Sequence, residues 1–186
     1  MKKWEAIQSE ALGANGVVTL ARARNLGVSP TEIYRWCNGG RLIKVGRAVF
    51  RLTAYPSRGD VSDLTALVAQ FGDGAFLYGE SALALYGLCP TRPYVAAIAS
   101  PRRIRMKTAP AGVSLIKTPR GCRFTYHEGV ACQKPQDAIR ACIGVLETGR
   151  LADAIETAVA KGLFAETEAG ALRKEIEDGK AAAQRT

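Results

Sequence analysis

Residues 16–52 read GVVTLARARNLGVSPTEIYRWCNGGRLIKVGRAVFRL, and this stretch is the most informative part of the chain. Thr19 is placed to cap a short helix over residues 20–26, which a glycine then ends. The pair Ser29-Pro30 supplies a cap and a first-turn proline for a second helix. We expect that helix to run to about Asn38, where two consecutive glycines stop it.

A hairpin is predicted directly after the second helix. Two short apolar runs, residues 42–45 and 48–52, are separated only by Gly46-Arg47, the two-residue spacing of a tight β-turn. The order helix, short turn, helix, hairpin is that of a winged helix-turn-helix. In that arrangement the second helix enters the DNA major groove and the hairpin lies against the backbone.

Charge and side-chain type point to the second helix and the hairpin as the DNA contacts. Residues 1–60 contain ten Lys/Arg and four acidic residues, a net charge of +6. Basic hairpin side chains suit phosphate contacts, whereas polar helix side chains can reach bases or phosphates. The candidates are Ser29, Thr31, Tyr34, Arg35 and Asn38 on the helix, and Arg41, Lys44, Arg47 and Arg51 in and beside the hairpin. A small basic helical subdomain with solvated charges is the alternative interpretation.

Two domains are expected, with the boundary in a turn-rich segment before Asp60. Residues 1–56 would form the winged helix-turn-helix domain, opened by a helix that carries Trp4, Ile7, Ala11 and Leu12 on one face. Residues 60–186 would form a mixed α/β domain. The predicted fold class is therefore α+β, with a winged helix-turn-helix followed by a mixed α/β domain that ends in helices. The expected helices of the second domain are 62–71, 81–88, 135–147, 151–163 and 168–179, and the expected strands are 94–99, 113–117 and 122–127.

A second basic region lies in the middle of the chain. Residues 81–127 contain eight Lys/Arg and no Asp or Glu, and the densest cluster is Arg102, Arg103, Arg105 and Lys107. A positive field without internal counter-charge attracts polyanions. We interpret the cluster as an extension of the DNA contact; a solvated basic loop, or a role with a protein partner, are the alternatives.

The sequence gives little support for catalysis or for a metal site. The five cysteines include no CxxC pair, which argues against a thiolate zinc site and fits reduced thiols in the cytoplasm. Gly79-Glu80-Ser81 is similar to the Gly-Ser element of nucleotidyltransferases, but the expected strand after it has no paired carboxylates for Mg²⁺. His127 is the only histidine, and a pairing of it with Cys122 or Cys132 has no local signature. We expect no catalytic residue, no metal and no cofactor.

The sequence also predicts where the protein is located. No apolar run is long enough to span a membrane, and the start, MKKWEAIQSE, lacks the apolar core of a secretion signal. A cytoplasmic protein is therefore expected.

Three stretches, taken in order, resemble the AbiEi family, the antitoxin component of type IV toxin–antitoxin systems. The first is the predicted winged helix quoted above. The second is GESALALYGL followed by YVAAIAS and PRRIRMK, and the third is GCRFTYHEGVACQKPQDAIRACI with the helices after it. Together they cover residues 16 to about 165. Residues 134–138, KPQDA, depart from the family pattern at that point.

The resemblance implies a cytoplasmic repressor that binds inverted repeats in the operator of its own operon. It also implies a functional partner, a nucleotidyltransferase-like toxin that the protein opposes without a stable complex. The sequence leaves two other functions open. One is a stand-alone winged-helix regulator whose second domain senses a ligand or mediates oligomerisation, and the other is a degenerate nuclease or transferase.

Overall fold

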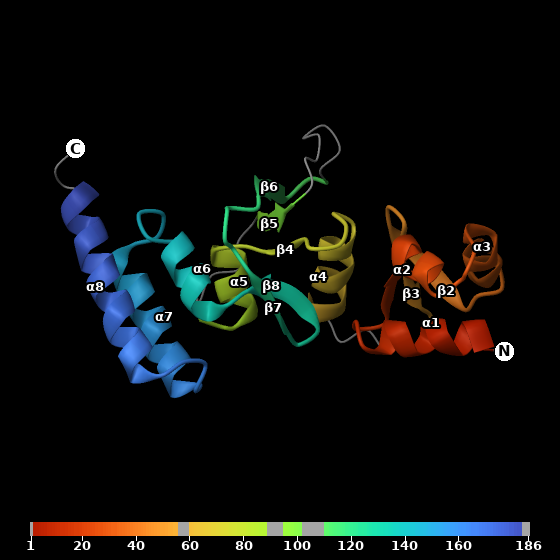
Figure 1. Cartoon of the computed structure of the whole chain (residues 1–186), viewed down its shortest axis with the longest axis horizontal. Helices are drawn as coiled ribbons and strands as arrows, with labels where there is room; N and C mark the ends of the chain where they lie inside the picture. The colour runs from red at the N-terminus through yellow and green to blue at the C-terminus, as the bar shows by residue number, and fades with distance from the viewer. Residues whose placement is uncertain (1, 56–59, 89–94, 102–109, 184–186) are drawn as a thin grey trace. The chain divides into compact units, whose positions relative to one another are not determined.

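The computed structural model describes residues 2–55, 60–88, 95–101 and 110–183 (Figure 1). Within these ranges the chain forms eight α-helices and eight β-strands in two sheets, so it is a mixed α and β structure, in agreement with the predicted α+β class. The chain divides into two compact units. Unit 1 is Met1–Ala75 with Glu128–Ala131, and unit 2 is Phe76–His127 with Cys132–Thr186.

Unit 1 begins with three helices and a small antiparallel sheet. The sheet has the strand order β1-β3-β2, and β2 and β3 form a hairpin. The elements are α1 (Lys2–Leu12), β1 (Val17–Thr19), α2 (Leu20–Asn25), α3 (Pro30–Asn38), β2 (Leu42–Gly46), β3 (Val49–Leu52) and α4 (Asp60–Ala69).

The two faces of this small sheet cover two different cores. Val18 and Phe50 are opposite each other in register and lie on the face that packs against α1, α2 and α3. Val17 and Val49 lie on the other face, where they pack with Ala66 of α4. Because side chains alternate along a strand, one short sheet is buried on both faces. Helix α4 therefore belongs to unit 1, whereas the sequence placed the domain boundary before it.

Two local details of unit 1 differ from expectation. The hairpin turn is Arg47-Ala48 instead of Gly46-Arg47, because β2 continues to Gly46 through an irregularity in register after Lys44. Ala48 takes a positive φ of 57° in this turn. On α1, Ile7 and Ala11 are buried as expected, but Leu12 is 61% exposed, since it lies about 100° around the helix from Ala11.

Unit 2 is built on a five-stranded sheet with the order β6-β5-β4-β8-β7, in which only the first two residues of β8, Val130 and Ala131, are counted with unit 1. The pairs β4–β8 and β5–β6 are parallel, whereas β4–β5 is antiparallel. The strands are β4 (Phe76–Leu77), β5 (Ala96–Ser100), β6 (Val113–Lys117), β7 (Phe124–His127) and β8 (Val130–Gln133). The helices are α5 (Glu80–Leu85), α6 (Pro135–Ala141), α7 (Thr148–Ala160) and α8 (Glu166–Ala183).

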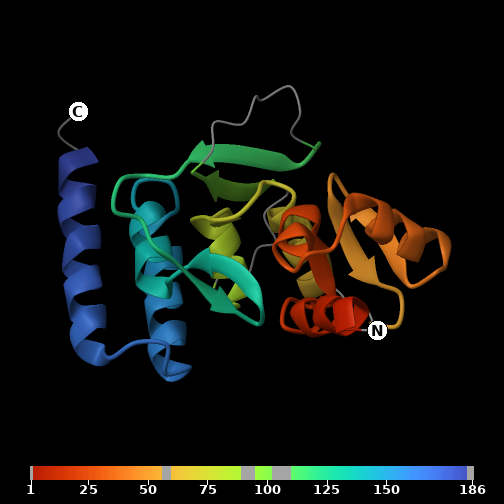
Figure 2. The ribbon, with the colours of Figure 1, turned by 45° about the vertical axis from the view of Figure 1, so that its right-hand side comes forward.

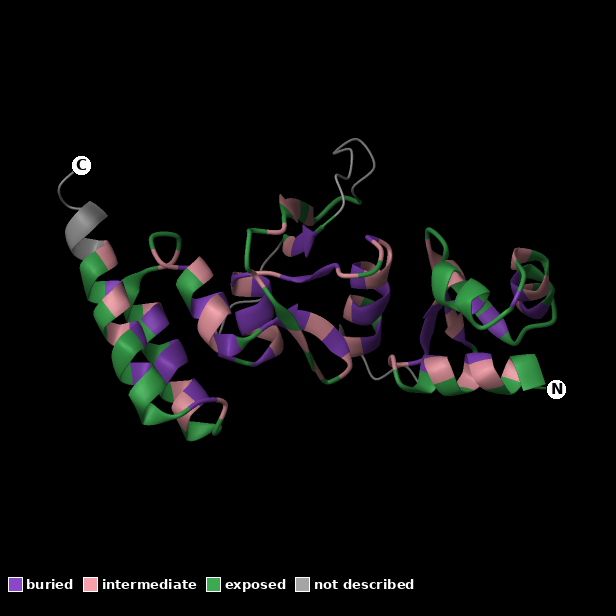
Figure 3. Cartoon of the chain, viewed as in Figure 1, coloured by how far each residue is buried: buried purple, intermediate pink, exposed green. Residues whose placement is uncertain are grey.

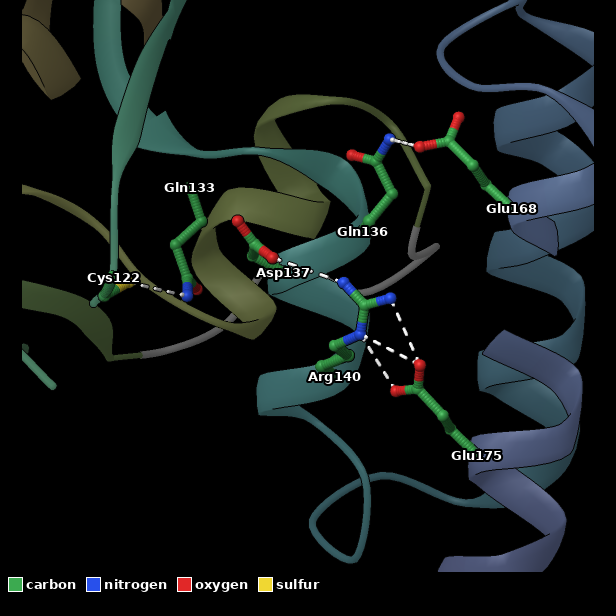
Figure 4. A network of polar contacts seen from close by, with 7 residues as sticks. All are labelled: Cys122, Gln133, Gln136, Asp137, Arg140, Glu168 and Glu175. Carbon is green, nitrogen blue, oxygen red and sulfur yellow. Dashed lines mark hydrogen bonds and ion pairs between the residues drawn. The ribbon is translucent and has the colours of Figure 1, made fainter. Parts of the chain in front are cut away.

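The last two helices lie side by side as an antiparallel pair (Figure 2). Buried residues recur along α8 at Ala169, Leu172 and Ile176. Figure 3 shows buried positions alternating with exposed ones along this helix. This spacing is that of a helix with one apolar stripe. Polar contacts fasten α8 to α6 (Figure 4): the Arg140 guanidinium holds the Glu175 carboxylate with a nitrogen–oxygen distance of 2.9 Å, and Gln136 Nε2 donates to Glu168 at 3.0 Å.

Unit 2 also contains strands that the sequence did not reveal. β4 has only two residues, too few for an alternation pattern, and β8 follows β7 after the tight turn Glu128-Gly129. The expected helix over 135–147 ends at Ala141, and a glycine with positive φ follows at position 144. The strands β4 and β8 depend on pairing with strands that are distant in sequence, and no local sequence signal marks them.

Candidate nucleic-acid interface

The candidate interface begins with two capped helices. Thr19 Oγ1 caps α2 by accepting a hydrogen bond from the Arg22 N–H at 3.2 Å. Ser29 Oγ accepts from the Glu32 N–H at 3.2 Å, and the Glu32 carboxylate accepts from the Ser29 N–H at 2.9 Å. This reciprocal capping box fixes the first turn of α3 at the position that the sequence predicts.

Four of the predicted DNA contacts share the solvent face of α3. Thr31, Tyr34, Arg35 and Asn38 follow the spacing i, i+3, i+4, i+7 and are all exposed. The opposite face buries Ile33 and Trp36, so the helix cannot turn this polar stripe inward.

Tyr34 is the aromatic member of this stripe. The residue is 45% exposed. The ring lies edge-on to Phe50 of β3, with ring centroids 5.8 Å apart. This contact limits the positions of the ring.

The one carboxylate of α3 is held away from the polar stripe. Lys3 Nζ of α1 lies 3.1 Å from both oxygens of Glu32. Hydrogen bonds from the Ser29 backbone and side chain, together with the nearby Lys3 ammonium, lower the pKa of Glu32 to about 2. Glu32 is therefore ionised, but its charge is compensated within the protein.

A second contact from α1 supports the junction between α3 and the hairpin. The rings of Trp4 and Trp36 meet edge-on with centroids 5.0 Å apart, and the Arg41 guanidinium lies 5.2 Å from the centre of the Trp4 ring. Arg41 is exposed and remains next to the end of α3. The sequence marked Trp4 as a packing residue, but it gave no signal for the contact with Arg41.

The hairpin separates its basic residues between two faces. Lys44 lies opposite Phe50 in register, and so on the face of the sheet toward α3, and Arg47 occupies the turn; both are exposed. The Arg47 N–H donates to Gln70 Oε1 at 3.4 Å, which ties the turn to the residue after α4. Nothing in the sequence pointed to Gln70.

Arg51 lies on the other face of the hairpin. Its guanidinium donates to the Asp63 carboxylate at 2.9 Å and to Ser62 Oγ at 3.4 Å, and the side chain is only 18% exposed. The sequence grouped Arg51 with the phosphate contacts. Because side chains alternate between the two faces of a strand, Arg51 instead points to α4, and we leave it out of the interface.

The predicted basic cluster Arg102, Arg103, Arg105 and Lys107 lies outside the described residues.

The residues considered for nucleotidyl transfer have structural contacts in unit 2. Glu80 Oε1 accepts from the Arg150 guanidinium at 3.1 Å. Ser81 Oγ is buried and accepts the N–H of Ala97 at 2.9 Å. Both contacts fasten the start of α5 to its neighbours.

Of the two cysteines considered as nucleophiles, Cys132 is fully buried. Cys132 Sγ donates to Tyr86 Oη at 3.3 Å, and the Tyr86 ring stands 4.4 Å from the His127 ring. Burial raises the pKa of both the Cys132 thiol and the Tyr86 hydroxyl. A nucleophilic cysteine needs the opposite shift, because the thiolate is the reactive form.

Among the described residues, no group of three or more His, Cys, Asp or Glu side chains is arranged to hold a metal ion. None of the helices in the same ranges is long and apolar enough to cross a membrane. A comparison with protein-family models and with curated proteins finds no match to this chain.

Proposed function

We propose that residues of unit 1 form a winged helix-turn-helix that binds double-stranded DNA. The observation that carries this proposal is the exposed stripe Thr31, Tyr34, Arg35 and Asn38 on α3, beside a hairpin that presents Lys44 and Arg47. An α-helix fits the major groove, where each base pair offers a distinct pattern of donors and acceptors.

Different residues would supply specificity and affinity. Arg35 can donate two hydrogen bonds to guanine, and Asn38 can pair with adenine. Thr31, in the first turn of α3, is suited to phosphates or to nearby bases. The Ser29 hydroxyl donates its one proton to the Glu32 carboxylate at 2.9 Å, so we leave Ser29 as a helix cap and not as a DNA contact. Lys44, Arg47 and Arg41 would contact the backbone and contribute affinity that does not depend on sequence.

We further propose that the protein represses its own operon and acts as a type IV antitoxin. This part rests on the resemblance to the AbiEi family and on the DNA-binding assignment. The partner in function would be a nucleotidyltransferase-like toxin, and the protein itself would bind rather than catalyse. We keep Arg102, Arg103, Arg105 and Lys107 as an extension of the DNA contact.

Binding to the promoter of its own operon tests the DNA-binding proposal. The full chain is titrated into a labelled duplex that covers this promoter, with a scrambled duplex of the same length and composition as the control. We expect tighter binding to the promoter and affinity that falls with added salt. Failure to bind either duplex would refute the proposal, and equal affinity for both would refute the repressor function.

Co-expression tests the antitoxin function separately. The full chain is expressed together with the nucleotidyltransferase-like gene beside its own, and growth is scored. Rescue supports the antitoxin. Promoter binding without rescue would favour the stand-alone regulator.

A further inference from the structure

An aromatic ladder lies on the edge strand of the larger sheet. Phe124 and Tyr126 of β7 are two residues apart and so point to the same face of the sheet. Phe124 is 37% exposed and Tyr126 is 59% exposed. β7 is the last strand in the order β6-β5-β4-β8-β7, so no further strand covers it within the described residues.

A buried ring packs against the inner residue of the ladder, Phe124. Phe76 of β4, which is buried, stacks on Phe124 with ring centroids 5.5 Å apart and an angle of 19° between the ring planes. Phe124 then meets Tyr126 edge-on at 5.8 Å. These contacts limit the positions of the outer ring, which lowers the side-chain entropy that a flat ligand stacking on it would cost.

The surroundings of the ladder are basic. The segment that leads into β7 carries Arg120 and Arg123, both exposed. Neither forms an ion pair with a described residue, and residues 110–127 contain no Asp or Glu. The first carboxylate after the strand is Glu128, in the turn to β8. Exposed rings beside exposed cations are the combination by which proteins bind single-stranded nucleic acid.

We propose that β7 and the segment before it bind single-stranded nucleic acid. An unpaired base stacks on Tyr126, and the two arginines contact the adjacent phosphates. Bases of duplex DNA are stacked on one another and cannot reach these rings, so this site is distinct from the duplex contact of α3. The proposal uses only residues of unit 2 and does not depend on the proposed function of unit 1.

The test measures binding of the full chain to a labelled mixed-sequence 20-nucleotide DNA strand, and to RNA of the same sequence. To weaken binding through unit 1, all variants are made in an Arg35→Ala, Arg47→Ala background. Tyr126→Ala should weaken binding at least about fivefold, and Tyr126→Trp should restore it, because stacking on one ring contributes about 1–3 kcal/mol. Arg120→Ala and Arg123→Ala should each lower the slope of log affinity against log salt by about 0.7.

Val145→Ala and Lys174→Ala are the matched controls, since both residues are exposed in unit 2 and belong neither to β7 nor to the segment before it. They should leave affinity and salt slope unchanged, and circular dichroism should show every variant folded. Binding of the DNA strand, the RNA strand or both that Tyr126→Ala weakens would support the proposal, whichever of the two binds more tightly. Two results would overturn it: no single-strand binding in the Arg35→Ala, Arg47→Ala background, or binding that Tyr126→Ala leaves intact.

Discussion

At the scale of single residues, Arg35 is the side chain of α3 best suited to identify a base. It lies in the middle of the exposed stripe and belongs to no ion pair among the described residues. A bidentate contact to guanine contributes about 1–3 kcal/mol of discrimination. Arg35→Ala should therefore lose about that much binding free energy on the promoter duplex and less on the scrambled duplex, as measured by fluorescence anisotropy. Equal losses would make Arg35 a backbone contact instead.

Glu32 predicts how the first turn of α3 responds to acid. Its pKa is about 2 in the folded chain and about 4.3 in an unfolded one. Because the folded value is the lower one, the carboxylate stabilises the fold above about pH 4, and this contribution disappears as the pH falls toward 2. Glu32→Gln keeps a side chain able to cap Ser29 but loses the charge that pairs with Lys3.

Thermal melts of wild type and Glu32→Gln, followed by circular dichroism from pH 7 to pH 2, measure this contribution. We expect wild type to melt higher at pH 6–7 and the two melting temperatures to converge as the pH falls from about 4 toward 2. A gap that stays constant with pH would mean that the Glu32 charge adds nothing to stability.

At the scale of elements, we expect the charge of the hairpin to add affinity for DNA of any sequence. The hairpin should not help to distinguish one DNA sequence from another. Lys44→Ala and Arg47→Ala should each weaken binding to the promoter and the scrambled duplex alike. Each should also reduce the slope of log affinity against log salt by about 0.9, the value for one lost phosphate contact on duplex DNA. Lys174→Ala on α8 is the control for losing an exposed cation elsewhere.

Arg51→Ala separates the two faces of the hairpin. Because Arg51 pairs with Asp63 on the α4 face, we expect its loss to leave the salt slope unchanged. An unchanged slope in Lys44→Ala and Arg47→Ala would contradict the proposed wing, and a slope reduced by Arg51→Ala would return this residue to the interface.

The elements that the sequence predicted well are those with a local signal. The caps at Thr19 and Ser29-Pro30 and the apolar spacing of Ile33 and Trp36 were enough to locate α2 and α3. The hairpin was found from its two apolar runs, but its turn was predicted one residue early. The tertiary contacts that support the turn, from Gln70 above all, lie far away in sequence.

The sequence predicted which residues the candidate site contains, but not the direction in which each side chain faces. Charge alone grouped Arg51 with Lys44 and Arg47. Only the pairing of Ile43 with Arg51 and of Lys44 with Phe50 shows that Lys44 and Arg51 face opposite ways. In the same way, the support of α3 by Lys3 and Trp4 depends on how α1 packs, and no spacing rule encodes such a long-range contact.

At the scale of the whole molecule, the contact of α4 with the small sheet decides which piece of the chain can fold by itself. Val17 and Val49 are nearly fully buried together with Ala66, and Arg51 is held by Asp63. A fragment that ends at residue 55 would expose both valines, at a cost of about 1.5–3 kcal/mol each. That loss is comparable with the entire stability of many small domains.

We therefore expect the fragment 1–75 to melt cooperatively and the fragment 1–55 to be largely unfolded at 25 °C. The fragment 1–75 also loses a contact, the hydrogen bond from Asn15 Nδ2 to the Glu128 carbonyl at 2.7 Å. A single hydrogen bond contributes only about 0.5–1.5 kcal/mol, so the burial by α4 outweighs it. Circular dichroism melts of both fragments beside the full chain make the comparison. Equal melting temperatures for the two fragments would return the domain boundary to residues 56–60, where the sequence placed it.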